Sequence, residues 1–291
     1  MGLYETLATT RLQISIPWSA DGKKASLPVV LLAAVPAVLP AAYVAYVLGK
    51  GARRTTASAS ITPPDPLVGN ARSGEVKADA LALPPAVLAA PDQYVVARER
   101  VVSEAVPLSR ILPGLRRGLE DDDDDAETGK GLLETYLGTT MRMFTWTPQA
   151  YVMKRMVSRL PDGPVHADTF STPYLDTCLF EDGDRVCGVY VVRERFVNSR
   201  GDERVFLDLS PPEGWKGPVV NGVLDCRFVH EEKGGEGFVR FVNETVLWRK
   251  KDERPTLLEG TVSRWLHTTM IRWMIVRGVE AVTGGNAKVK A

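Results

Sequence analysis

Short polar patterns in the middle of the chain could carry acid–base chemistry. His166 and Asp168 are two residues apart, and Tyr174 begins a similar polar alternation a few residues later. Alternate residues of a strand share one face, so two strands here would bring these side chains together. A histidine beside a carboxylate can act as a general base, because the acid fixes which ring nitrogen carries the proton. The same alternation is typical of an ordinary half-exposed strand, so both interpretations stay open.

Arg193 is the fourth candidate for a catalytic role. It lies among valines in a segment that we expect to be a strand, residues 185–197. In a pocket its guanidinium could bind a carboxylate or an enolate, and at a rim it could extend its charged end into water. We therefore predict a catalytic set made of His166, Asp168, Tyr174 and Arg193.

The two other histidines are weaker candidates for chemistry. His230 ends an expected strand and fits a turn position. His267 stands beside Trp265 and Leu266 in an expected C-terminal helix. There it could line a cavity, or it could fill the interface between helix and sheet.

The signatures of cofactor and nucleophile chemistry are missing from the sequence. It contains no GxSxG motif, no phosphate-binding loop and no dinucleotide fingerprint. Cys178, Cys187 and Cys226 have no CxxC spacing, and no HxxxH pattern accompanies them. We therefore expect no cofactor, no metal site and three buried free thiols. The 36 basic residues balance 36 acidic ones, so no nucleic-acid partner is expected.

The elements that must position these residues begin with a strand and two helices. Residues 94–102 are rich in β-branched side chains and predict a strand. Residues 131–146 predict a helix that Pro148 ends, and a second helix can follow over residues 149–160. The apolar stripe expected on the first helix consists of Leu133, Tyr136, Leu137, Thr140, Met141 and Phe144.

A meander of strands and a long final helix are expected next. Gly-rich turns separate segments that we expect to pair antiparallel. The expected strands are residues 165–171, 174–180, 185–197, 204–209, 219–230 and 237–250. Thr256 and Glu259 have the spacing of a capping box and predict a helix over residues 257–282. Its buried face is expected to hold Leu258, Val262, Trp265, Leu266, Thr269, Trp273 and Val276.

The N-terminal part of the chain predicts attachment to a membrane. Leu27 to Gly49 is a run of 23 residues without charge, and about 20 suffice to span a bilayer. Pro36 and Pro40 would kink a helix there, which leaves a re-entrant hairpin open as an alternative. The run begins too late and is too long for a signal peptide. The basic cluster after it and the unpaired cysteines favour a cytosolic C-terminal domain. A single-pass protein of the endoplasmic reticulum is expected.

These features divide the chain into five expected parts. They are an N-terminal segment (1–26), the anchor (27–49), a Pro/Ala/Ser-rich linker (50–92), an α+β domain (93–283) and a flexible tail (284–291). Within the domain, the acidic run at residues 120–125 is expected to be a solvated loop, since adjacent carboxylates on a loop do not preorganise a metal site.

The predicted fold class is α+β, with a curved antiparallel sheet whose apolar face is covered by the long C-terminal helix. Over residues 93–283 this order of elements resembles the helix-grip fold of the START superfamily, which includes polyketide cyclases and lipid carriers. The resemblance rests on the order of elements, and the acidic loop is an insertion relative to that pattern.

A closer resemblance is carried by the block TYLGTTMRMFTWTPQAYVM, residues 135–153, with the apolar N-terminal segment and the Pro/Ala-rich stretch. Together they resemble membrane-anchored cyclase-like proteins encoded in fungal polyketide gene clusters such as the aurovertin cluster. The resemblance implies a cofactor-independent cyclase that cyclises, lactonises or releases a hydrophobic polyketide, with the membrane and a polyketide synthase as partners. Two alternatives stay open: a membrane-tethered carrier without activity, and a hotdog thioesterase, which the helix at 131–146 followed by strands suggests.

Overall fold

The computed structural model describes residues 42–62, 83–120 and 130–285. The chain consists of two compact units, residues 1–50 and 51–291. The described residues of the first unit, 42–50, are helical. Within the described ranges, no helix is both long and apolar enough to cross a membrane. Most of the predicted anchor, residues 27–41, lies outside the described residues, so the anchor stays a prediction.

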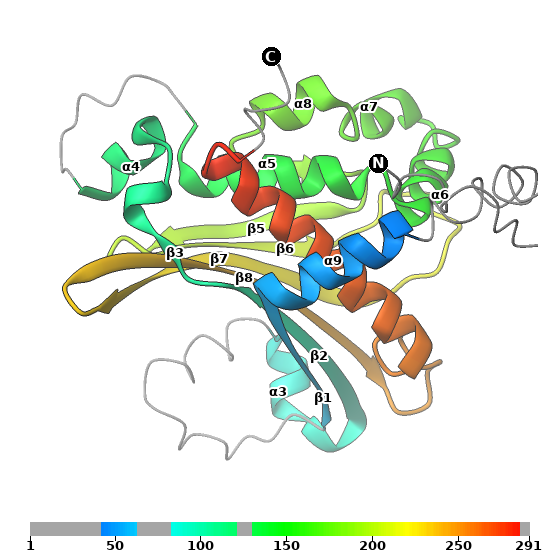
Figure 1. The fold of residues 1–291 in the computed structure, drawn as a ribbon. Coiled ribbons are helices and arrows are strands. Elements are labelled where there is room, and N and C mark those ends of the chain that lie inside the picture. Colours follow the sequence, from blue (N-terminus) through cyan, green and yellow to red (C-terminus); the bar gives the residue numbers. More distant parts are fainter. Residues whose placement is uncertain (1–41, 63–82, 121–129, 286–291) are drawn as a thin grey trace, which may run out of the picture. The chain divides into compact units, whose positions relative to one another are not determined.

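An antiparallel sheet forms the centre of the second unit (Figure 1). Its neighbouring strands run in the order β1-β2-β8-β7-β6-β5-β4, and β3 pairs with β8 beside this path. The strands are β1 (Thr55–Thr62), β2 (Tyr94–Ser103), β3 (Val106–Pro107), β4 (Arg185–Val186), β5 (Tyr190–Val197), β6 (Glu203–Leu209), β7 (Asn221–Lys233) and β8 (Glu236–Lys250). The expected strands at 94–102, 204–209, 219–230 and 237–250 are therefore confirmed. The strand expected at 185–197 is instead a hairpin, because β4 and β5 pair antiparallel with each other.

Helices lie on both faces of this sheet (Figure 1). The helices are α3 (Pro85–Ala89), α4 (Pro113–Glu120), α5 (Leu132–Phe144), α6 (Pro148–Val157), α7 (Gly163–Asp168), α8 (Thr172–Thr177) and α9 (Thr261–Val282), with 3-10 turns η1 (Pro91–Gln93) and η2 (Leu108–Arg110). Helices α5 and α9 cover one face, which we call the helical face, and α3 lies against the other, the far face. The predicted α+β class, with a large curved antiparallel sheet and a C-terminal helix, is thus confirmed.

The strand register decides which side chains reach each face. Val205 and Leu207 of β6 join the core under α5 and α9, whereas Phe206 between them packs on the far face with Val87 of α3. This alternation follows from the two-residue period of a strand. The register is fixed at the β7–β8 turn, where Gly234 and Gly235 both have positive φ angles, as a tight two-residue hairpin requires.

The main packing helix was predicted correctly. All six residues of its expected stripe are buried, and Pro148 opens α6 with Thr147 as its N-cap. Helix α9 approaches α5 closely at Gly278, where an added Cβ would stand 2.6 Å from the ring of Tyr136. That ring stacks on Phe241 of the sheet, with 4.3 Å between ring centroids. The glycine therefore lets two helices share one face of the sheet.

Two of the expected strands are helices instead. Residues 165–171 and 174–180 overlap α7 and α8, each of which begins with a proline in its first turn. Proline at the start of a helix has the right φ angle and loses no hydrogen bond there. Ser171 completes the signal by accepting a hydrogen bond from the backbone N–H of Tyr174. These start signals outweigh the polar alternation that suggested strands.

Part of the expected linker belongs to the sheet. Thr55–Thr62 is strand β1, which pairs along its whole length with β2. Its composition of Thr, Ala and Ser suggested a linker, but the run also suits an edge strand beside a long partner. Leu83 and Val87 are buried as well. Residues 63–82 of that linker, residues 121–129 of the acidic loop, and residues 286–291 of the tail lie outside the described residues.

The buried face of α9 differs from the predicted one. Trp265 and Leu266 are each 56% exposed, whereas Met274 and Ile275 are buried. The helix begins at Thr261, after the Thr256–Glu259 turn that was expected to cap it. Apolar residues occur on both sides of this helix, so periodicity alone could not select the side that packs.

Candidate active site

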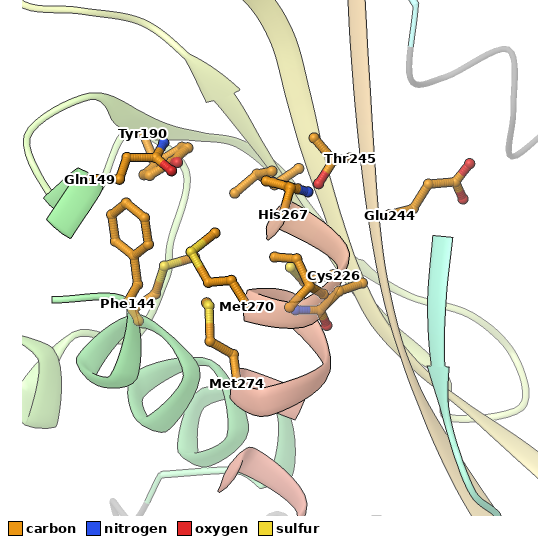
Figure 2. Close-up of a pocket in the computed structure, with 13 residues that line it drawn as sticks. Phe144, Gln149, Tyr190, Cys226, Glu244, Thr245, His267, Met270 and Met274 are labelled. Carbon is orange, nitrogen blue, oxygen red and sulfur yellow. The ribbon is translucent and has the colours of Figure 1, made fainter. Parts of the chain in front are cut away.

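A pocket opens on the helical face between α5, α9 and the sheet (Figure 2). Its cavity is small, about 30 Å³, and the space between the lining side chains amounts to about 450 Å³ only when the part open to solvent is included. In Figure 2, Phe144 of α5 and Met270 and Met274 of α9 point into the same space. The lining side chains are mainly apolar: Met141, Phe144, Tyr190, Leu224, Met270, Ile271 and Met274. Such a wall suits a hydrophobic ligand.

A buried carboxylate and a histidine meet at this pocket. Glu99 of β2 is only 2% exposed. One of its carboxylate oxygens contacts His267 Nδ1, and the other contacts the hydroxyl of Thr268, both residues being on α9. His267 also lines the pocket, as Figure 2 shows. The structure thus places a Glu–His pair between strand β2 and this pocket.

The pair determines which atom of His267 can do chemistry. A carboxylate can only accept hydrogen bonds, so the shared proton resides on Nδ1 of the neutral ring. Nε2 then carries the lone pair and can act as a general base. This is the arrangement that acid–base catalysis needs.

A fixed amide supplies a hydrogen-bond donor at the same pocket. Tyr136 on α5 is completely buried, and its hydroxyl donates to Asn243 Oδ1 at 2.7 Å. Burial raises the pKa of Tyr136 well above its ordinary value, so it remains the donor in this bond. Asn243 lines the pocket, and its side-chain amide nitrogen is a group that can donate hydrogen bonds. Such a donor can stabilise an enolate or alkoxide oxygen.

The other polar side chains in the pocket are poor nucleophiles. Burial raises the pKa of the Cys226 thiol and of the Tyr190 phenol well above their ordinary values. Both therefore stay protonated near neutral pH, whereas a cysteine nucleophile acts as its thiolate. Within the described ranges no group of three His, Cys, Asp or Glu side chains could hold a metal ion. Glu244 also lines the pocket, but its carboxylate pairs with Arg98, Arg100 and Arg227. The Glu99–His267 pair is therefore the candidate for acid–base chemistry at this pocket.

The structure does not bring the predicted His166–Asp168 pair together. Both residues lie on α7, where a spacing of two turns the side chains about 200° apart. Asp168 is exposed, and His166 is half-buried with a buried Nδ1 that has no hydrogen-bond partner among the described residues. Neither residue lines the pocket. The face-sharing argument from sequence required a strand and fails on a helix.

Tyr174 and Arg193 also lie outside the pocket. The hydroxyl of Tyr174 donates to the backbone carbonyl of Arg185 at 2.7 Å, and burial raises its pKa to about 12. Arg193 pairs with Asp208 at 3.1 Å and stacks over the ring of Phe206, 4.8 Å from its centroid. Phe206 belongs to the far face of the sheet. Tyr174 therefore ties α8 to the sheet edge, and Arg193 stabilises the face opposite the pocket.

Sequence reasoning missed Glu99 and left His267 undecided. Glu99 stands between Ala97 and Val101 on the buried face of its strand. A lone acid among apolar residues of one strand face was the available signal, because a buried carboxylate needs a partner. The partner is 168 residues away in the chain, and no local pattern connects them.

The three cysteines are expected to react slowly in the folded protein. All three are buried, and burial raises the pKa of Cys178 from its ordinary 9.0 to about 11. At pH 8 the thiolate fraction of Cys178 should then be about 100-fold below that of an ordinary thiol. Titration with a disulfide reagent should release no rapid thiol from native protein and three after denaturation. One rapid thiol in the native protein would contradict this burial.

Comparisons with known proteins give this chain no relative. No protein-family model, curated protein or solved structure matches it. A function must therefore be argued from the pocket itself.

Proposed function

We propose that the protein is a cofactor-independent acid–base catalyst that cyclises or lactonises a hydrophobic polyketide chain. The observation that carries this proposal is the Glu99–His267 pair at an apolar pocket. The polyketide as substrate class comes from the sequence resemblance. An apolar pocket with one base and one fixed donor supports it, because a poly-β-keto chain has acidic protons and carbonyl oxygens that match those two groups.

The proposed reaction needs one proton to leave the substrate and return. His267 Nε2 removes the proton of an enol hydroxyl or of a carbon between two carbonyls, and Glu99 stabilises the resulting imidazolium. Asn243 donates to the oxygen on which negative charge develops. The enolate attacks a carbonyl carbon of the same chain. In carbon–carbon cyclisation the C=O π bond of that carbonyl breaks, and the resulting alkoxide takes the proton back from the imidazolium. In lactonisation of a thioester the enolate oxygen attacks, the C–S bond breaks, and the imidazolium returns its proton to the departing thiolate.

We further propose that the domain is a helix-grip domain of the START type. Support comes from the return of the β4–β8 meander to pair with β2, the first strand after residue 93, and from α9 lying across the sheet. β1 would be an added edge strand. The hotdog hypothesis expects one central helix wrapped by sheet, and it leaves unexplained why α9 packs beside α5 on one face.

A carrier function is the second candidate, because most of the pocket wall is apolar. A carrier needs a cavity and no base, so the Glu99–His267 pair would then be a structural contact. In either case the predicted anchor would hold the domain at the membrane of the endoplasmic reticulum, into which hydrophobic ligands partition. A polyketide synthase is the proposed partner.

Co-expression of the full chain with a polyketide synthase that releases a linear poly-β-keto chain tests the proposal. We expect the ratio of cyclised to shunt products to rise when the protein is present. Purified protein should also bind an apolar fluorescent probe that the linear chain displaces. Displacement without any change in product ratio would replace the catalyst with the carrier, and an unchanged ratio without displacement would overturn both.

A further inference from the structure

We propose that the exposed aromatic and basic side chains on α6 and on the first half of α9 form a surface that docks on an anionic phospholipid bilayer. Both helices contribute to the wall of the pocket, α6 through Gln149 at its start and α9 through His267 and Met270. Contact with the bilayer would therefore occur beside the pocket. This inference concerns binding alone and does not depend on the proposed catalysis.

The apolar part of this docking surface consists of large side chains that are mostly exposed to solvent. On α9, Val262, Trp265 and Leu266 follow a spacing of three and four residues, so they lie on one side of the helix. They are 71%, 56% and 56% exposed. Near the start of α6, Trp146 and Tyr151 are 78% and 66% exposed. Trp and Tyr prefer the interfacial layer of a bilayer, where the apolar part of the ring contacts lipid and its polar atom contacts water.

The sequence of α6 and of the first half of α9 carries charges of one sign only, although the exposed acids Asp162 and Glu213 lie next to the end of α6. Residues 135–161 and 260–279 contain no Asp or Glu, although the whole chain has 36. Lys154, Arg155 and Arg159 are exposed on or next to α6. Basic residues next to interfacial aromatic ones are attracted to the negative surface of a cytosolic leaflet. A bilayer matches both the apolar and the basic character, which favours it over a neutral protein partner.

Few residues separate the predicted anchor from the start of the domain. The anchor is expected to end at Gly49, and the second unit begins at Gly51. The stretch expected to be a linker instead contains β1, whose first residue is Thr55. If the anchor inserts, the domain starts within a few residues of the membrane, so its effective concentration at the bilayer surface is high. Such a short connection favours contact between the domain and the bilayer, and the docking surface has the composition suited to that contact.

The test uses full-length protein reconstituted in vesicles of phosphatidylcholine, with or without about one-third phosphatidylserine. A Leu266→Cys variant carries an environment-sensitive dye, which the buried native cysteines should not take up. The matched control is Val197→Cys at the end of β5, which is similarly exposed at 60%. We expect a blue shift, and quenching by spin-labelled lipid, at position 266 and not at 197. The anchor alone would not produce this difference between two sites of one domain.

Charge reversal provides the second arm of the test. Lys154→Glu with Arg155→Glu should lower the docked-to-undocked ratio at position 266 by about tenfold or more in phosphatidylserine vesicles, since each basic residue near an anionic surface favours contact. Both residues are exposed, so the fold should be unaffected. No shift at 266, or equal shifts at 266 and 197, would overturn the proposal. If the dye at position 266 shows no blue shift on vesicles and shows one only after a protein is added, this surface is a protein interface instead.

Discussion

Replacing His267 with alanine is expected to lower the rate of product formation by about 10²–10⁴-fold, the usual contribution of a positioned general base. Among the residues that line the pocket, His267 is the only histidine, and its Nδ1 contacts Glu99. Glu99→Gln should also lower the rate, because the amide has no negative charge to stabilise the imidazolium. The measurement is the ratio of cyclised to shunt products, with far-UV circular dichroism as the check on folding.

The chain contains only three histidines, so replacing the other two provides a control for every histidine. His230 forms a second histidine–carboxylate pair, with 3.0 Å between its Nδ1 and Asp202, but it does not line the pocket. His230→Ala and His166→Ala are therefore expected to leave the product ratio unchanged. If His166→Ala abolishes cyclisation while His267→Ala does not, the site predicted from sequence is correct and the pocket is not the active site.

A readout of binding separates catalysis from packing. His267→Ala should retain affinity for the displaced apolar probe, because most of the wall is apolar and unchanged. Lost turnover with retained binding supports a catalytic base. Parallel loss of both, with a lower unfolding midpoint, would mean that the Glu99–His267 contact only holds α9 on the sheet.

More of the fold than of the candidate site could be predicted from the sequence. The stripe on α5 and the strands from β5 to β8 have clear periods and Gly-rich turns, and these signals are local. Helices α7 and α8 were misread because six-residue helices are too short to show a period of 3.6. Glu99 and His267 are 168 residues apart in the sequence. The pairing of β2 with β8 under α9 brings them together.

The far face of the sheet holds the charge cluster whose loss should destabilise the fold most. Asp225 on β7 is 1% exposed and accepts two hydrogen bonds from Arg204, at 2.8 and 2.6 Å. Arg227 contacts the same carboxylate. The guanidinium of Arg204 also lies 4.4 Å from the ring centroid of Phe206. Arg227 also lies 3.6 Å from the buried Glu244. Asp225 is the carboxylate that joins the two arginines beside an aromatic layer.

Asp225→Ala is expected to lower the free energy of unfolding by about 3–5 kcal/mol, because it leaves buried positive charge without its carboxylate. That is a large share of the roughly 5–15 kcal/mol by which most proteins are stable. The matched control is Asp176→Ala, whose partner Arg142 is 3.2 Å away in an exposed ion pair. It should cost at most about 1 kcal/mol, since solvent screens such pairs.

Urea unfolding of the full chain, followed by tryptophan fluorescence in one detergent, measures both variants under equal conditions. A double variant, Asp225→Leu with Arg204→Met, tests the reason for the loss. Replacing both charges with apolar side chains should recover part of the stability lost in Asp225→Ala, because the cost comes from the unpaired charge and not from a missing attraction. If Asp225→Ala costs no more than Asp176→Ala, water must reach Arg204 in solution, and the far face is more open than the burial of Asp225 indicates.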